Sequence, residues 1–232
     1  MFTLDHVVPW GRSFDEYRRM FALSDRDLMR PILGCGDGPA SFNAVLTGRG
    51  GAVVSVDPLY RYDADHIRER IAVTSDHIME QVRGNMAVFI WKEPIRSVEE
   101  LRDVRMSAMS LFLDDYDAGK AAGRYVDAEL PAIPFPCGTF DLALCSHFLF
   151  LYSAHLDAAF HQAAIREMCR VATEVRIFPL LTLDGEWSPW VEPVATDLRE
   201  RGYQVTLETV AYEFQRGANQ MMRIVGPPPA ER

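Results

Sequence analysis

Three glycines at alternate positions follow a short apolar run, and this feature constrains the fold of the chain more than any other. The apolar run is Ile32-Leu33, and the glycines are Gly34, Gly36 and Gly38. A second apolar run, residues 53–56, ends in a single carboxylate. Glycines let a backbone turn tightly and approach a ligand, and a helix N-terminus behind them favours binding. The pattern predicts a ligand crevice at the edge of a parallel sheet.

The spacing of the glycines excludes two known kinds of phosphate-binding loop. A dinucleotide-binding loop has the spacing G-x-G-x-x-G, whereas this chain has G-x-G-x-G followed by Pro39. A P-loop needs Gly-Lys-Ser or Gly-Lys-Thr, which is absent here. The acid after the second apolar run, Asp57, is placed to accept both hydroxyls of a ribose, and the alternative is that it only caps a helix or a turn.

Segments further along the chain continue the pattern in a recognisable order. Glu129-Leu130 precedes Ile133-Pro134-Phe135-Pro136, and the stretch 138–147 reads GTFDLALCSH. Together with the glycine loop, these segments resemble motif I, the third-strand exit and the fourth strand of class I S-adenosylmethionine-dependent methyltransferases. The resemblance covers about residues 28–225, and the string GDGPASFN resembles a little-described bacterial branch of that family.

This resemblance implies S-adenosylmethionine as the cofactor and S-adenosylhomocysteine as the product. The glycine loop would hold the methionine moiety and Asp57 the ribose, while the Glu129 side chain and the Leu130 amide would meet the adenine. Asp127 is the alternative to Glu129. Arg12 and Tyr17 would reach the cofactor carboxylate from an N-terminal helix, or that helix is only docked on the core. The full set of expected cofactor residues is Arg12, Tyr17, Gly34, Cys35, Gly36, Gly38, Asp57, Pro58, Glu129, Leu130 and Ser146.

The chain departs from the family at one position. Two residues before the first glycine the family usually has an acid that helps to hold the methionine end of the cofactor. Here that residue is Ile32. Asp37, inside the glycine loop, is the alternative acid for this contact.

His147 is the expected catalytic residue because it directly follows the fourth strand and titrates near neutrality. Methyl transfer needs alignment of the acceptor and, for some acceptors, removal of a proton. Tyr152 and His155, on the next loop, are further catalytic candidates. The alternative is that His147 only shapes the pocket.

Composition limits the function further. The chain has 232 residues and a net charge of −9, which argues against a large phosphate-binding surface and therefore against nucleic acid. The N-terminus lacks a signal peptide, no apolar run is long enough to span a bilayer, and the four cysteines lack C-x-x-C spacing. These features favour a cytoplasmic protein without a membrane or metal partner.

Strands that alternate with helices predict an α/β protein, with a doubly wound, Rossmann-like sheet of seven mostly parallel strands and a terminal antiparallel hairpin. We expect one domain over residues 1–226 and a disordered tail over 227–232. Residues 58–123 form a helical insertion between the second and third strands. Its expected apolar stripes are Ile67, Ile71, Ile78 and Val82 in one helix and Leu101, Val104, Ala108 and Leu111 in the other.

The insertion has two interpretations. It covers the sheet, or it forms a lid or a homodimer surface beside the crevice. The acidic run Asp114-Asp115-Tyr116-Asp117 within it favours a solvated turn over a metal site, because no histidine accompanies it.

The sequence thus predicts a methyltransferase that acts on a small molecule. One rival is a methyltransferase-like protein that binds or senses without catalysis, which Ile32 favours. Another is an enzyme acting on nucleic acid or protein, but no Asn-Pro-Pro-Tyr-type motif follows the fourth strand.

Overall fold

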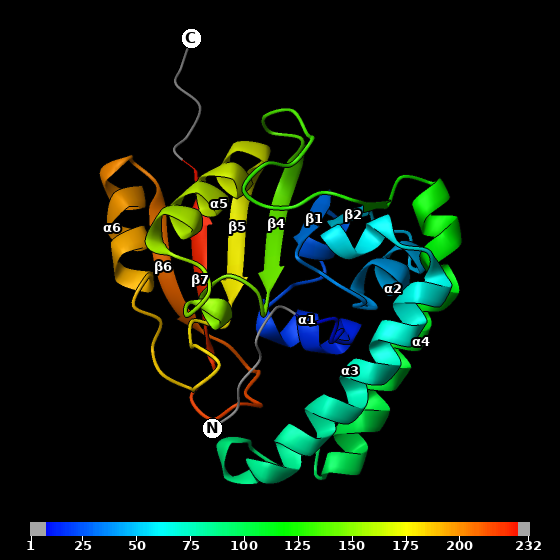
Figure 1. Ribbon diagram of the computed structural model, residues 1–232. Coiled ribbons are helices and arrows are strands. Elements are labelled where there is room, and N and C mark those ends of the chain that lie inside the picture. The colour runs from blue at the N-terminus through cyan, green and yellow to red at the C-terminus, as the bar shows by residue number, and fades with distance from the viewer. Residues whose placement is uncertain (1–7, 227–232) are drawn as a thin grey trace.

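Residues 8–226 are described by the computed structural model, and within them seven strands form one sheet in the order β3-β2-β1-β4-β5-β7-β6 (Figure 1). Neighbouring strands are parallel except β7, which is antiparallel to both β5 and β6. The predicted α/β fold is therefore confirmed. The expected tail at 227–232 lies outside the described residues. The strands are β1 (Ile32–Cys35), β2 (Val53–Val56), β3 (Tyr125–Val126), β4 (Phe140–Ser146), β5 (Ala172–Phe178), β6 (Gln204–Thr209) and β7 (Gln220–Val225).

The strand order reverses at β1, which fixes where a ligand can bind. β1 pairs with β2 on one side and with β4 on the other, so that Ile32 lies opposite both Val53 and Leu142. Chain connections leave these neighbouring strands toward opposite sides, and a crevice opens beyond their carboxyl ends. The glycine loop follows β1 at that point, and Asp57 follows β2.

Helices cover both faces of the sheet (Figure 1). On one face α5 and α6 pack against the sheet, and on the other face α1 and α2 do. No helix within residues 8–226 has the length and apolar character needed to cross a bilayer. The helices are α1 (Phe14–Met20), α2 (Phe42–Gly48), α3 (Ala64–Gly84), α4 (Val98–Ala121), α5 (Ala158–Val171) and α6 (Val191–Glu200), with short 3-10 turns η1 (Asp27–Met29), η2 (Pro58–Arg61), η3 (Met86–Val88) and η4 (Phe150–Tyr152).

Several boundaries differ from those expected. The helix predicted from residue 39 begins at Phe42, because residues 39–41 follow the N-terminal segment instead: the Ser41 amide donates to the carbonyl of Arg12. The third strand is short because only Ser55 and Val56 of β2 pair with it. The predicted N-terminal helix is confirmed, with Ser13 and Glu16 forming its capping box.

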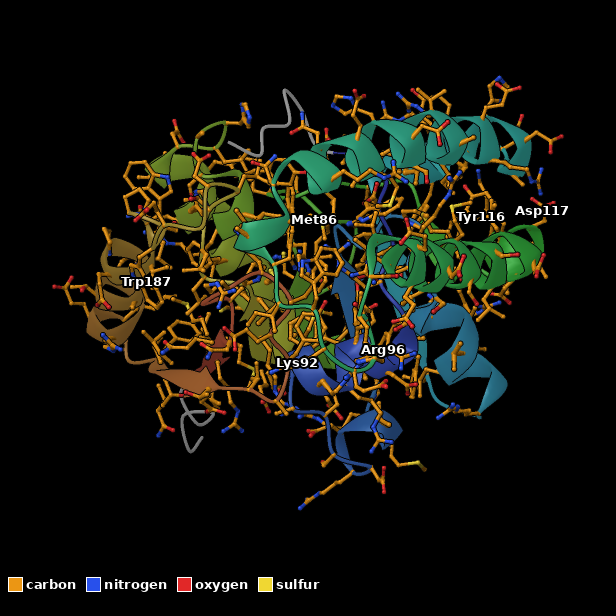
Figure 2. The ribbon with its side chains drawn as sticks, turned by 90° about the horizontal axis from the view of Figure 1, so that it is seen from below. Met86, Lys92, Arg96, Tyr116, Asp117 and Trp187 are labelled. Carbon is orange, nitrogen blue, oxygen red and sulfur yellow. The ribbon has the colours of Figure 1, made fainter. Side chains whose placement is uncertain are left out.

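The insertion is a pair of long helices, α3 and α4, packed along each other (Figures 1 and 2). Figure 2 shows Tyr116 and Asp117 toward one end of the pair and Met86 toward the other. The predicted stripe of α3 is confirmed, since its four residues are all buried. The stripe predicted for α4 is wrong in part: Leu111 is 47% exposed, and the buried face runs instead through Arg105, Met109, Phe112 and Tyr116.

The base of the insertion shares its core with the sheet. Tyr60, Phe112, Tyr116 and Tyr125 pack ring against ring, with centroids 5.1 to 6.0 Å apart. Tyr125 belongs to β3, and its hydroxyl donates to Asp115 of α4 at 2.8 Å. The insertion is therefore built into the edge of the sheet.

Replacement of Phe112 tests this integration. We expect Phe112→Ala to lower the free energy of unfolding by about 3–5 kcal/mol, the usual cost of deleting a buried phenyl ring. Leu111→Ala, one residue away on the exposed face, should change it by less than about 0.5 kcal/mol. Urea unfolding followed by fluorescence measures both. A first, separate transition for the insertion in wild-type protein would show that the insertion is not integrated.

Candidate active site

The glycine loop has the backbone that its sequence predicts. Gly36 and Gly38 have φ angles of +64° and +53°, a region that side chains disfavour. Gly34 is required for another reason: a Cβ atom there would lie 1.7 Å from Oδ2 of Asp37. The loop thus closes over its own carboxylate.

Asp37 is buried beneath the loop, and both of its carboxylate oxygens accept hydrogen bonds there. Its Oδ1 accepts the hydroxyl of Tyr17 at 2.8 Å, and its Oδ2 accepts the hydroxyl of Ser55 at 2.6 Å. Burial raises the pKa of Asp37 to about 6. Asp37 therefore anchors α1 and β2 to the loop. Its use as a substitute for the missing family acid stays a prediction. Ile32, in the usual acid position, is itself buried in the core.

Tyr17 has the same structural role from its own side. Its ring stacks on Phe42 at 4.7 Å between centroids, and its hydroxyl faces Asp37. Phe14 and Phe21 are also buried, so α1 is docked on the core as the alternative interpretation held. A direct contact of Tyr17 with a cofactor stays a prediction.

Asp57 lies at the tip of β2 between the glycine loop and the 3-10 turn η2, which its side chain caps. Oδ2 accepts the amide of Gly38 and Oδ1 accepts the amide of Leu59, each at 2.8 Å. Burial raises its pKa to about 6, and the negative charge of Glu129 also raises it. Each oxygen accepts one amide here and has a second lone pair, so the carboxylate can also accept two hydroxyls.

The other expected cofactor residues lie at or just after the carboxyl ends of β1, β2 and β3. Pro58 opens the 3-10 turn η2 after Asp57, and Cys35, at the end of β1, is buried with its thiol pKa raised by that burial. Glu129 and Asp127 are exposed beyond β3, where Asp127 lies 3.5 Å from Arg61. Leu130 is buried between them and the core.

The end of β4 presents Ser146 and then His147. The serine hydroxyl lies 2.9 Å from Nδ1 of His147, and the His147 amide donates to Phe178 of β5 at 2.7 Å. His147 has a φ of +53°, an uncommon conformation for histidine. Burial is the main cause that holds the pKa of His147 well below 6.5. The positive charges of Arg12 and Arg105 lower this pKa further. The expectation that His147 titrates near neutrality is therefore wrong, and the ring is neutral at pH 7.

A buried ion cluster, which the sequence did not predict, lies beside His147. Glu16 of α1 pairs with Arg105 of α4, and both side chains are 1% exposed. The other oxygen of Glu16 accepts the hydroxyl of Tyr212, in the connection between β6 and β7, at 2.8 Å. Burial would raise the pKa of Glu16, but the charges of Arg105 and Arg12 bring it down to about 2. The only sequence signal was an arginine on the buried face of α4.

Arg12 completes this cluster without a carboxylate of its own. Its guanidinium donates to the carbonyl of Trp10 at 2.6 Å, and it makes no ion pair among residues 8–226. Burial and the neighbouring charge of Arg105 lower its pKa to about 10, so it stays cationic at pH 7. Two guanidinium groups therefore face one carboxylate.

A cavity of about 110 Å³ opens next to these charges. Its walls come from α3, α4, the ends of β4 and β5, and the β6–β7 connection. They include Arg12, Arg105, His147 and Tyr152, whereas Gly34, Asp57 and Glu129 do not line it. The cavity therefore reaches the ends of β4 and β5 and not the glycine loop.

The remaining catalytic and metal candidates are less favourable. Tyr152 lines the cavity, but burial raises its pKa, so it is no base near neutrality. His155 stacks obliquely on Tyr152 at 6.3 Å and does not line the cavity. In the acidic run, Asp115 pairs with Arg124 at 2.7 Å. Residues 8–226 contain no group of acids, histidines and cysteines arranged to hold a metal.

The chain has a close relative among known proteins. It is 33% identical over 223 residues to an uncharacterized protein of Methanocaldococcus jannaschii, MJ0045, and the match covers 96% of this chain and 97% of the other. The chain belongs to the family of this archaeal protein. No model of a described protein family matches the chain. Because this relative is archaeal, membership of a bacterial branch stays a prediction.

Solved structures share the general arrangement at low identity. A magnesium protoporphyrin IX methyltransferase from Synechocystis PCC 6803, with bound SAM, is 11% identical with a TM-score of 0.46, covering 91% of this chain and 90% of that one. A putative S-adenosyl-L-methionine-dependent methyltransferase from Methanococcus maripaludis is 12% identical with a TM-score of 0.46, covering 94% and 84%. Because these identities and TM-scores are low, the fold assignment rests on the strand order of the chain itself.

Removal of the Glu16 charge should weaken the whole fold. We expect Glu16→Gln to lower the free energy of unfolding at pH 7 by about 3–5 kcal/mol, because it leaves a buried arginine without its counter-charge. Asp15→Asn, on the exposed side of the same helix, is the control and should be nearly neutral.

The pH dependence gives a second test of Glu16. A carboxylate whose pKa is lowered from 4.5 to about 2 on folding stabilises the protein above pH 4.5 and loses this effect as the pH falls toward 2. The difference between wild type and Glu16→Gln should therefore shrink from pH 4.5 downward. A difference that is constant across this range would rule out the charge as its cause.

The ionisation of His147 can be measured without a substrate. We expect its imidazole to remain neutral at pH 6.5, whereas exposed His66, whose pKa is raised by hydrogen bonding to Asp63, should be mostly protonated. Nitrogen NMR shifts of the two rings report this directly. Protonation of both rings at the same pH would contradict the electrostatic description of the site.

Proposed function

We propose that the chain is an S-adenosylmethionine-dependent methyltransferase that acts on a small-molecule acceptor. The observation that carries this proposal is the geometry of Asp57. Its carboxylate lies at the tip of β2, is bonded to the glycine loop through Gly38, and has lone pairs left for a ribose diol. The strand order reverses at β1, and the glycine loop begins at the end of that strand.

The residues present fit the cofactor. The positive φ angles of Gly36 and Gly38 expose a backbone that lets a ligand approach closely. In this proposal the loop holds the methionine part, Asp57 the ribose, and Glu129 with the Leu130 amide the adenine. When bound, the cofactor supplies an electrophilic methyl group on a sulfonium.

The chain then contributes alignment more than strong base catalysis. Neutral His147 lies at the end of β4 and lines the cavity, where it can accept a hydrogen bond from an acceptor. The positive charges of Arg12 and Arg105 oppose its protonation, and the same charges stabilise a negatively charged acceptor atom. Tyr152 contributes to the cavity wall.

Calorimetric titration with S-adenosylhomocysteine tests the cofactor assignment. We expect a dissociation constant in the micromolar range, about −7 to −8 kcal/mol, and a loss of about 1.5–3 kcal/mol in Asp57→Ala. Asp141→Ala removes an exposed acid near the amino-terminal end of β4, away from the expected site, and is the matched control. Equal losses in both variants would refute the ribose assignment.

The same titration should depend on pH in a defined direction. Ribose hydroxyls donate to the ionised form of Asp57, whose pKa is about 6 in the unliganded protein. Affinity should therefore fall below pH 6, by up to about tenfold per pH unit. Asp57→Asn should lose this dependence although Asp37, with a similar pKa, is still present.

A non-enzymatic binding or sensor protein is the second candidate function. Ile32 replaces the family acid, and Asp37 is buried and bonded to Tyr17 and Ser55, so that neither position presents an exposed carboxylate to the methionine end of a cofactor. Absence of binding at millimolar S-adenosylhomocysteine would favour this candidate.

A cytoplasmic location and a homodimer through the insertion also remain proposals. Val73 of α3 and Leu111 of α4 are exposed apolar residues that such a dimer contact could cover, and sedimentation tests the oligomeric state.

A further inference from the structure

The buried charges around the cavity do not balance within the described part of the chain. Arg105 is 1% exposed and Arg12 is half-buried. Among residues 8–226, Glu16 pairs with Arg105, and Arg12 has no carboxylate partner. The Nε atoms of Arg12 and Arg105 are both buried and have no hydrogen-bond partner among residues 8–226. A buried donor without a partner and a buried charge without a counter-charge each carry a free-energy cost.

The position of the surplus charge indicates what would compensate it. Both arginines line the cavity, whose other walls are mostly apolar: Ile78 and Val82 from α3, Leu101 from α4, Phe178 from β5, and Phe214 from the β6–β7 connection. An apolar cavity with a few convergent polar groups is the usual form of a small-molecule site. A ligand that fits these walls has an apolar body and one negative group.

The cofactor crevice is a less suitable place for that negative group. None of the glycine-loop residues, Asp57 or Glu129 lines the cavity, whereas His147 does. The cavity therefore lies on the β4–β5 side of the site, where the acceptor would meet His147. The two arginine Nε donors without a partner therefore indicate a negative group on the acceptor, and not the carboxylate of the cofactor.

We propose that the acceptor is a small, mostly apolar carboxylic acid whose carboxylate is bound by Arg12 and Arg105. This inference rests on the proposed methyltransferase function, whose acceptor site it describes. One carboxylate matches the single surplus charge, and guanidinium groups bind carboxylates through paired hydrogen bonds. The cavity volume of about 110 Å³ is of the order of an engineered apolar cavity of about 150 Å³ that binds benzene.

Benzoate and benzamide are the probes, because they have nearly the same shape and differ in charge. Each is titrated calorimetrically into the full-length protein, with and without saturating S-adenosylhomocysteine. We expect saturable benzoate binding and at least about tenfold weaker benzamide binding, as for a lost hydrogen bond to a charged group.

Arg12→Met is the decisive variant, because it leaves the contacts of Glu16 with Arg105 and Tyr212 in place and should remain folded. It should weaken benzoate binding at least about tenfold and leave benzamide binding unchanged. Arg68→Met, which removes an exposed arginine of α3, is the control and should bind benzoate as wild type does. Thermal unfolding of each variant verifies that it is folded.

Other outcomes overturn the proposal. Equal binding of benzoate and benzamide, absence of benzoate binding, or unchanged benzoate binding in Arg12→Met would each do so. If Arg12→Met instead weakens S-adenosylhomocysteine but not methylthioadenosine, which lacks the carboxylate, Arg12 holds the cofactor. Failure of S-adenosylhomocysteine to bind, with charge-selective benzoate binding retained, would refute the methyltransferase function while the anion site stands.

Discussion

The buried carboxylate of Glu16 holds together three parts of the chain that are far apart in sequence. It caps its own helix α1 through Ser13, pairs with Arg105 of the insertion, and accepts the hydroxyl of Tyr212 in the β6–β7 connection. The insertion, the β6–β7 connection and the segment directly before α1 form walls of the cavity. Since a broken buried ion pair is strongly destabilising, the shape of the cavity depends on this one contact.

A second set of hydrogen bonds fixes α1 to the opposite part of the site. The Tyr17 hydroxyl donates to Asp37, and Asp37 also accepts from Ser55 of β2. The glycine loop is therefore held from beneath by a helix that also carries Glu16. This arrangement couples the crevice at β1 and β2 to the cavity at β4 and β5, with His147 facing the cavity from the end of β4. Figure 1 shows α1 near the carboxyl ends of the central strands.

Local patterns in the sequence were sufficient for much of the fold. The capping box of α1, the apolar stripe of α3 and the glycine loop each depend on residues within a few positions of one another. The buried face of α4 was not predictable in the same way, because it includes a charged residue, Arg105, whose partner is 89 positions away. A stripe made only of apolar residues passes through Leu111 and leaves out Arg105, so the predicted face of α4 differs from the buried one.

The electrostatics of the site were also beyond local reasoning. The pKa of His147 is low because Arg12 and Arg105 approach it from the N-terminal segment and from the insertion. The role of Asp37 depends on Tyr17 and Ser55, which lie on either side of the glycine loop in sequence. Asp57 could be placed correctly because its position follows from the strand end alone. The site was therefore predictable where strand geometry determines it, and unpredictable where distant charges do.

The most direct test of this account is a crystal structure of the protein grown with S-adenosylhomocysteine. The account predicts the ribose hydroxyls within hydrogen-bond distance of Asp57, the homocysteine part along the loop from Gly34 to Gly38, and the sulfur facing the cavity that contains Arg12 and His147. A ligand bound with its ribose away from Asp57, or no ligand at millimolar concentration, would contradict it.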